Sequence, residues 1–427
     1  MPDRRSFQSF HPFTRLSRLL DAHAPGNPGG NPAGNETPIL LSVGEPKNQP
    51  PAFVAEEITA AASTWSSYPP PRGSEAYRRA CADWLTQRYD LPSGMIDQQK
   101  HILPLPGSRE GLFFAVVAAM QTYMQKHGED GAPPAVLLPN PFYQVYVGAA
   151  VAVGAEPVFV PATAETGFMP DYTALDPALL DRTAFCFLNS PANPQGAAAS
   201  RDTMARLIDL ARRHDFTVGF DECYSEIYGT TAPDGALQAA QDLGGSLDHL
   251  LVFHSLSKRS SAPGLRCGFA AGDAALIDGL DVALRVGGAG VGYPILAAGT
   301  RLWRDEAHVE ANRDYYRKNF ALAERILGNR FGFRQPDGGF CLWLDVGDGE
   351  AAALKLWREA GVRVLPGAYL AEPGPDGVNP GARYIRVALV YDAAVTEEGL
   401  NRLVQVLGDS DTARLQGTAP HVATAQG

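Results

Sequence analysis

The sequence has few cysteines, no long apolar run and no excess of positive charge. No window approaches the 18 consecutive apolar residues of a membrane-spanning helix. Residues 1–20 contain no unbroken apolar stretch of the kind that marks a secretory signal. Five widely spaced cysteines without a CxxC pair argue against a disulfide or zinc framework. We therefore expect a cytoplasmic protein with no membrane partner and with free thiols at Cys81, Cys186, Cys223, Cys267 and Cys341.

Acidic residues outnumber basic ones. The chain has 47 Asp and Glu against 36 Lys and Arg, which gives a net charge of −11. Such a chain has no overall field that would attract nucleic acid, so we expect no nucleic-acid partner. The nine histidines form no HExxH, and no GxxxxGK[ST] loop is present, so we expect no metal site and no phosphate loop of that type.

What the chain does contain is an alternation of short apolar runs and amphipathic stretches over 427 residues, enough for two or three domains. The apolar runs predict strands and the stretches between them predict helices. Short buried strands separated by helices are typical of an α/β fold with a mostly parallel sheet flanked by helices. A charged helix over 305–327 is expected to lead into a second, C-terminal domain. The expected strands are 135–138, 157–160, 184–188, 216–220, 250–254 and 267–271, and the other main helices 109–126 and 201–214.

Two segments near the N-terminus have their own character. Residues 7–22 predict a short amphipathic helix, and residues 24–38 predict a turn-rich linker.

The stretches that follow three consecutive expected strands are rich in polar residues. Ligands in open α/β sheets bind beyond the carboxyl ends of the strands, so these stretches are expected to meet at one site. Any one of the residues alone is compatible with a solvated surface position, whereas the ordered set is much more specific. In chain order the set is Asn193, Asp221, Tyr224, Lys258 and Arg266.

A Gly-Ser turn precedes the helix expected over 109–126. Gly107-Ser108-Arg109 leaves free N–H groups and the positive end of the helix dipole at this point. Such a helix start is an N-cap in most proteins and also serves as an anion site.

These residues resemble those of the fold-type I, pyridoxal-phosphate-dependent aminotransferases of class I/II. The resemblance covers roughly residues 38–405, and SLSKRSSAPGLRCGF around Lys258 is its most specific part. It implies a large domain that binds pyridoxal 5'-phosphate and a smaller α+β domain built from the N- and C-terminal segments. The expected divisions are 1–49 for the N-terminal segment of the small domain, 50–305 for the large domain, 306–408 for the rest of the small domain and 409–427 for a flexible tail.

The resemblance assigns roles around the cofactor ring. Lys258 is expected to form the Schiff base and then to move the substrate Cα proton. Asp221 is expected to pair with the pyridine nitrogen, which makes the ring a better electron sink. Tyr224 and Asn193 are expected to hydrogen-bond the phenolic oxygen, and Tyr143 to stack on the ring.

The phosphate of the cofactor is expected to be held by fixed donors. These are the backbone N–H groups of Ser108 and Arg109, the hydroxyls of Ser255 and Ser257, and Arg266. Arginine suits this role because its planar fork binds phosphate oxygens bidentately.

Substrate contacts and a partner contact also follow from the resemblance. Arg386, in YIRVALV, matches the arginine that clamps the substrate α-carboxylate, with Gly44 and Asn193 expected beside it. Family dimers complete each site with a tyrosine from the partner chain, and Tyr68 matches that position. The resemblance therefore implies a homodimer with shared sites.

Four longer stretches, 41–54, 138–150, 253–273 and 364–390, resemble the N-succinyl-diaminopimelate aminotransferases of bacterial lysine biosynthesis. This implies glutamate as amino donor and a long succinylated keto acid as acceptor. The glycine-rich segment 285–292 leaves room for a bulky substrate if it borders the pocket. Arg285 is then either a contact for a distal carboxylate or only a charge at a helix end.

Other functions stay open at this point. An aspartate or broad-range aminotransferase, or a C–S β-lyase on the same fold, shares the cofactor residues, so only product analysis separates a lyase cleanly. A non-catalytic transcription regulator with an aminotransferase-like half requires a DNA-binding segment, whereas the residues before Val43 are rich in Gly and Pro. Intact Lys258 and Asp221 also favour turnover.

Overall fold

The computed structural model describes residues 11–26, 37–128, 131–288 and 290–408. The tail expected over 409–427 and most of the linker expected over 24–38 lie outside these residues. Within them, the five cysteines are free, as expected, and no helix is long and apolar enough to cross a membrane.

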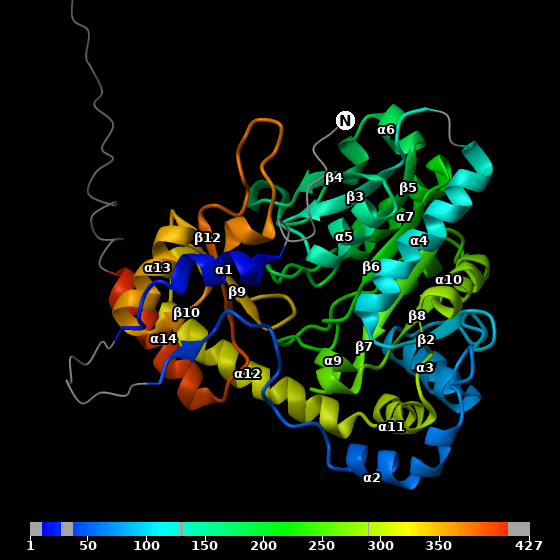
Figure 1. Ribbon diagram of the computed structural model, residues 1–427, viewed down its shortest axis with the longest axis horizontal. Helices are drawn as coiled ribbons and strands as arrows, with labels where there is room; N and C mark the ends of the chain where they lie inside the picture. Colours follow the sequence, from blue (N-terminus) through cyan, green and yellow to red (C-terminus); the bar gives the residue numbers. More distant parts are fainter. Residues whose placement is uncertain (1–10, 27–36, 129–130, 289, 409–427) are drawn as a thin grey trace, which may run out of the picture.

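A seven-stranded sheet forms the larger part of the molecule, on the right of Figure 1. Its strand order is β2-β8-β7-β6-β5-β3-β4. The ladders between β4 and β7 are parallel, while β8 pairs antiparallel with both β2 and β7, so the sheet is mostly parallel as predicted. The strands are β2 (Ile102–Leu105), β3 (Ala135–Asn140), β4 (Glu156–Pro161), β5 (Thr183–Asn189), β6 (Thr217–Asp221), β7 (Leu250–Ser255) and β8 (Gly268–Gly272).

Helices cover both faces of this sheet. Successive strand side chains point to opposite faces, so Phe185 and Phe187 of β5 join one apolar cluster and Cys186 and Leu188 join another. This two-sided burial explains why the strands are apolar without alternation. One face packs on α4 (Ser108–His127), α5 (Gln144–Ala152) and α10 (Ala274–Gly287), and the other on α3 (Glu75–Arg88), α7 (Arg201–His214), α8 (Ala236–Asp242) and α11 (Tyr293–Arg304).

The smaller part of the molecule, on the left of Figure 1, contains two small sheets. Three strands pair antiparallel in the order β11-β12-β9, and β1 pairs with β10. Their apolar cluster includes Tyr316, Leu356 and Leu403 from three helices. The elements are α1 (Pro12–Leu20), β1 (Ile39–Leu40), β9 (Cys341–Asp345), α13 (Gly349–Ala360), β10 (Val362–Arg363), β11 (Leu365–Pro366), β12 (Tyr384–Ala388) and α14 (Ala393–Leu407).

The long helix α12 (Ala307–Leu327) runs from α11 toward the small sheets, as expected of the charged stretch over 305–327. Short helices complete the chain: α2 (Phe53–Ala60), α6 (Pro177–Asp181) and α9 (Leu256–Arg259). The domain limits given above stay a prediction.

The carboxyl ends of β5, β6 and β7 lie side by side. Asn189 is the register partner of Asp221, and Asp221 is the partner of Phe253, two residues before the end of β7. The polar stretches that follow these strands therefore meet at one edge of the sheet, which faces the smaller part of the molecule.

Candidate active site

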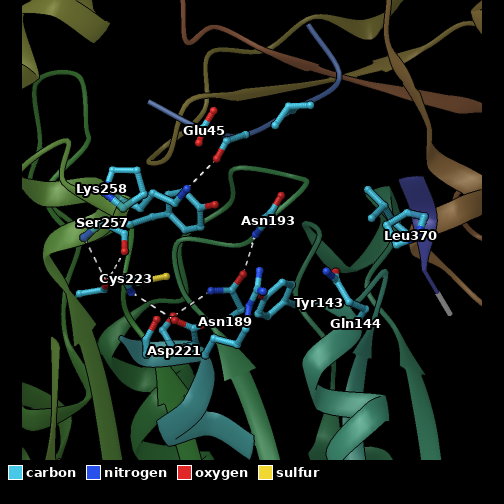
Figure 2. Close-up of a pocket in the computed structure, with 18 of the residues that line it drawn as sticks. Glu45, Tyr143, Gln144, Asn189, Asn193, Asp221, Cys223, Ser257, Lys258 and Leu370 are labelled. Atoms are coloured by element: carbon cyan, nitrogen blue, oxygen red, sulfur yellow. Dashed lines mark hydrogen bonds between the residues drawn. The ribbon is translucent and has the colours of Figure 1, made fainter. Parts of the chain in front are cut away.

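A cavity of about 300 Å³ opens at this edge. Twelve of the thirteen site residues predicted from the sequence line it. Figure 2 shows Asp221 at its base and Lys258 reaching toward the segment that carries Glu45. The twelve residues are Gly44, Ser108, Arg109, Tyr143, Asn193, Asp221, Tyr224, Ser255, Ser257, Lys258, Arg266 and Arg386.

Lys258 lies in α9, a single turn that begins directly after β7. The hydroxyl of Ser255 caps this turn by accepting a hydrogen bond from the backbone N–H of Ser257 at 3.1 Å. The Nζ atom of Lys258 donates to the carbonyl oxygen of Gly44 at 2.6 Å. Burial of the ammonium group lowers the pKa of Lys258 to about 8 from 10.5, with Arg386 acting in the same direction. The neutral amine is thereby brought close to neutral pH.

Asp221 ends β6 at the base of the cavity and is buried. Its Oδ2 atom accepts a hydrogen bond from the hydroxyl of Tyr146 at 2.7 Å, and the backbone N–H of Cys223 donates to Oδ1 at 3.3 Å. Burial raises the pKa of Asp221, and these hydrogen bonds oppose the rise. A buried carboxylate at this point is suited to pair with a cationic ring nitrogen.

Tyr146 was not predicted as a site residue. Its ring is fully buried and stacks on Phe187 at 4.2 Å between centroids. A signal was present in the sequence, because Tyr146 follows Tyr143 by three residues at the start of α5, and residues at this spacing share one helix face.

Two asparagines fix the loop after β5. The side-chain amide of Asn189 donates to the backbone oxygen of Asp221 at 2.8 Å, and its Oδ1 atom accepts from the backbone N–H of Asn193 at 2.7 Å. These bonds hold the side chain of Asn193 over the cavity (Figure 2). Tyr224 lies on another wall, where its ring meets the edge of Phe340.

The start of α4 and Arg266 form one corner of the cavity. Gly107 precedes the helix at φ 96°, a conformation that favours glycine, and a Cβ there would come within 2.3 Å of the Arg266 guanidinium. Arg266 is held by Glu110 at 2.9 Å, and Ser255 donates to the hydroxyl of Ser257 at 2.9 Å. Free N–H groups, hydroxyls and a guanidinium together make an anion site.

Arg386 reaches the cavity from β12. It is 6% exposed, and its Nη1 atom donates to Oδ1 of Asn193 at 3.2 Å while Nη2 donates to the backbone oxygen of Ser42 at 2.7 Å. Its Nε atom is buried with no partner among the described residues. A buried guanidinium with a spare donor and no carboxylate partner is prepared to bind an anion.

Sequence reasoning missed several lining residues because they come from distant segments. Phe13 of α1 and Leu370 lie on the wall contributed by the smaller part of the molecule. The sequence predicts an amphipathic helix over 7–22, but the periodicity of a helix does not show which cavity it lies against. Residues 7–10 of this expected range lie outside the described part of the chain. The remaining unpredicted lining residues are Pro12, Val43, Glu45, Phe142, Gln144, Asn189, Cys223 and Pro263.

The thirteenth predicted residue, Tyr68, and the open candidate Arg285 lie outside the cavity. Tyr68 is 96% exposed on the surface. Arg285 pairs with Asp281 one turn earlier on α10, as a charge near a helix end would. Among the described residues, no group of three or more His, Cys, Asp or Glu side chains is arranged to hold a metal ion.

Comparisons with known proteins agree with this geometry. The family model "Aminotransferase class I and II" matches residues 36–407. An LL-diaminopimelate aminotransferase from Desulforudis audaxviator is 32% identical over 381 residues, which cover 87% of this chain and 90% of that protein. That relative is named for diaminopimelate itself, without the succinyl group expected from the sequence.

Two solved aminotransferase structures are also similar to this chain over most of its length. An aminotransferase from Neisseria meningitidis is 38% identical with a TM-score of 0.85, covering 93% of this chain and 97% of that one. Aminotransferase AspB from Helicobacter pylori is 32% identical with a TM-score of 0.82, covering 93% and 98%. The chain therefore belongs to the class I and II aminotransferases, a family that uses pyridoxal 5'-phosphate bound as a Schiff base to a lysine.

Proposed function

We propose that this aminotransferase moves an amino group between glutamate/2-oxoglutarate and N-succinyl-LL-2,6-diaminopimelate/N-succinyl-2-amino-6-oxopimelate, a step of lysine biosynthesis. The observation that carries the reaction type is the presence of Lys258, Asp221 and Arg386 in one cavity. The substrate rests on the four stretches described above, and the charge of the cavity suits the cofactor phosphate and the substrate α-carboxylate. The cavity is lined by Arg109, Lys258, Arg266 and Arg386 against only two carboxylates, Glu45 and Asp221.

The residues present fit pyridoxal phosphate. The corner formed by Gly107, Ser108 and Arg266 suits the phosphate, because its donors are fixed and its guanidinium approaches the glycine closely. Asp221 is available for the ring nitrogen, and Lys258 is the lysine for the aldehyde. When bound, the cofactor supplies an electron sink for charge that develops at the substrate Cα.

Lys258 acts as the proton carrier in this proposal. Its lowered pKa makes the neutral amine accessible near neutral pH, as a general base requires. The bond from Nζ to the carbonyl oxygen of Gly44 shows that the amine reaches across the cavity toward the segment on the opposite wall. We propose that this amine takes the Cα proton and later returns it.

Arg386 orients the substrate. A bidentate guanidinium–carboxylate pair fixes the α-carboxylate and with it Cα. Because donor and acceptor both carry an α-carboxylate, one arginine serves both half-reactions. Asn193, which accepts a hydrogen bond from Arg386 at 3.2 Å, keeps the guanidinium plane directed into the cavity and is proposed to contact the phenolic oxygen together with Tyr224.

LL-diaminopimelate without the succinyl group is the second candidate, because the curated relative is named for it. The two substrates differ in charge at the distal end. Diaminopimelate carries an ammonium and a carboxylate there, whereas the succinylated compound carries two carboxylates. The four stretches described above favour the succinylated compound, since Arg266 and Arg386 are already assigned to the cofactor phosphate and the substrate α-carboxylate.

A single-turnover panel tests the proposal. Glutamate, aspartate, LL-diaminopimelate and N-succinyl-LL-diaminopimelate are each mixed with the loaded enzyme while the cofactor absorbance is followed. We expect glutamate and the succinylated compound to react fastest. Faster reaction of free LL-diaminopimelate would replace the first candidate by the second. Release of pyruvate, ammonia and a thiol from cystathionine would identify a C–S β-lyase instead.

We further propose a homodimer in the cytoplasm, with Tyr68 completing the partner's site. Tyr68 is accompanied in the chain by another exposed aromatic residue, since Trp65 is 59% exposed. A Cβ at Gly292 would touch Trp65, so the glycine-rich segment lies against the residues around Tyr68. Neighbouring exposed aromatic residues are typical of an interface, and five free thiols suit a reducing compartment.

A further inference from the structure

Asn312 of α12 is a buried asparagine whose side-chain amide makes hydrogen bonds at every available position. It is 3% exposed. Its Nδ2 atom donates to the backbone oxygens of Lys258 at 3.0 Å and of Arg259 at 3.1 Å. Its Oδ1 atom accepts from the hydroxyl of Ser261 at 2.8 Å and from Nδ2 of Asn48 at 3.3 Å. Two donors and two acceptor sites are all that an amide offers.

These four bonds join three separate parts of the chain. The first is the turn that carries Lys258, and the second is the helix α12 itself. The third is the segment 41–49, which carries Gly44 on the opposite wall of the cavity. Because Nζ of Lys258 donates to the carbonyl oxygen of Gly44, a closed ring of contacts runs from Lys258 through Gly44, Asn48 and Asn312 back to the backbone of Lys258.

The backbone of α9 needs hydrogen-bond partners from outside the helix. α9 has only four residues, so its last carbonyl groups have no partners within the helix. Two of them, on Lys258 and Arg259, are satisfied by Asn312. Buried carbonyl groups without partners destabilise the conformation that holds them, so the turn is expected to rearrange when the amide is removed.

We propose that Asn312 is a positioning residue, which holds the Lys258 turn and the segment 41–49 in one arrangement so that the ε-amine stays directed across the cavity. The proposal rests on Lys258 being the cofactor lysine, and not on the identity of the substrate. Asn312 does not line the cavity, so it acts through the residues that it holds.

The same helix supplies a matched control. Asn319 lies seven residues further along α12 and is 1% exposed. Its Nδ2 atom also donates to two backbone oxygens, those of Leu389 at 3.1 Å and Tyr391 at 2.8 Å, which lie after β12. Replacing either asparagine by alanine therefore removes two bonds to backbone oxygens from a similarly buried place. Only Asn312 is connected to the lysine turn, and only Asn312 also accepts bonds from Ser261 and Asn48.

The test compares hydrogen exchange in the loaded enzyme with Asn312→Ala and Asn319→Ala. Both variants should lose thermal stability. Only Asn312→Ala should accelerate backbone exchange in peptides covering 41–49 and 255–262, by about tenfold. It should also lower kcat per bound cofactor for every substrate while KM changes little, because no substrate contact is lost.

Two further variants separate the effect on the segment 41–49 from the effect on the Lys258 turn. They also cover the case in which Asn312→Ala fails to fold. Asn48→Ala, at a half-buried residue, should loosen 41–49 and leave 255–262 unchanged. Asn312→Asp keeps the acceptor for Asn48 and Ser261 but turns a carboxylate oxygen toward two carbonyl oxygens, so it should loosen 255–262 first.

Equal exchange in the Asn312→Ala and Asn319→Ala variants, or no change in either peptide, would overturn the proposal. Exchange is read without turnover, so this failure is distinguishable from a wrong substrate or a wrong cofactor lysine.

Discussion

Arg386 is buried and Lys258 is half-buried, yet neither is paired with a carboxylate in the cavity. Arg386 bonds to an amide oxygen and a backbone oxygen, and Lys258 bonds to a backbone oxygen. Burying a charge without a counter-ion is costly, so the fold keeps these groups at the expense of stability. The missing counter-ions are expected to arrive with the ligands.

Replacing Arg386 by lysine should preserve the charge and remove the planar fork. The substrates should still bind, but with Cα misplaced, and a displacement of about 1 Å can cost on the order of 100-fold in rate. We therefore expect Arg386→Lys to lower kcat/KM by at least about 100-fold for donor and acceptor alike. Steady-state kinetics with both substrates measures this. A loss confined to one substrate, or loss of bound cofactor, would assign Arg386 a different role.

Lys258 should make the stability of the cofactor-free enzyme depend on pH. Its pKa is about 8 in the folded protein against an ordinary value of 10.5, so between these values the unfolded chain binds more protons. Relative to Lys258→Met, the free energy of unfolding should therefore rise with pH from about 8 to 10.5, by on the order of 3 kcal/mol. Buried thiols such as Cys81 and Cys186, whose pKa values burial raises, act in the opposite direction, and they do so in both proteins. Denaturant titrations of both proteins at the two pH values measure it, and parallel pH profiles would contradict it.

Most polar site residues could be predicted from the sequence because strand ends locate them. Asn193, Asp221 and Lys258 follow consecutive strands, and parallel strands place their carboxyl ends at one edge. Residues such as Phe13 and Leu370 could not be predicted, because their position depends on how distant segments pack. Asn312 is a similar case: within its helix it is only a polar residue among others, and its four partners come from two other segments.

At the scale of elements, α5 shows how one helix start supplies two site residues. Tyr143 is the N-cap residue and lines the cavity, while Tyr146 lies in the first turn beneath it and donates to Asp221. One element therefore presents a ring to the cavity and also holds the carboxylate at its base.

Removing the Tyr146 hydroxyl should weaken Asp221 as the proposed partner for the ring nitrogen. The hydrogen bond from Tyr146 opposes the rise of the Asp221 pKa that burial causes, so Tyr146→Phe should raise this pKa further. A hydrogen bond to a charged group is worth about 1.5–3 kcal/mol, so kcat should fall about 10- to 100-fold. The matched control is Tyr172→Phe, whose buried hydroxyl donates to the backbone oxygen of Phe187. Equal kcat values in the two variants would rule out the role of Tyr146.

The strands of the large sheet were predicted closely from the sequence, and the strands of the small sheets were not. The six expected strands coincide with β3 to β8 within about two residues, since continuous apolar runs bounded by turns are clear signals. β2, with only Ile102–Leu105, was missed. β1, β10 and β11 have two residues each, which is too short for any periodicity to appear.

At the scale of the whole molecule, charge is distributed unevenly. The chain carries a net charge of −11, yet four cationic side chains line the cavity against two carboxylates. Such a cavity attracts anions in spite of the acidic surface. This suits a phosphorylated cofactor and substrates with several carboxylates.

The proposed dimer predicts that two inactive variants can restore each other. Hybrid dimers of a Tyr68→Phe subunit and a Lys258→Ala subunit contain one site with both native residues. If Tyr68→Phe alone is strongly impaired, mixing should recover partial activity. The control is each variant mixed with itself. Hybrids shown to form without any recovery would argue against shared sites.

Borohydride trapping reveals which lysine carries the cofactor, and we expect it to be Lys258. The chain has six lysines, all in its described part, and Lys258 is the one that lines the cavity. Reduction of the yellow loaded enzyme should fix the cofactor covalently, and peptide mass mapping should find the whole adduct on Lys258. An adduct on Lys47, Lys100, Lys126, Lys318 or Lys355 instead would contradict the assignment of the site.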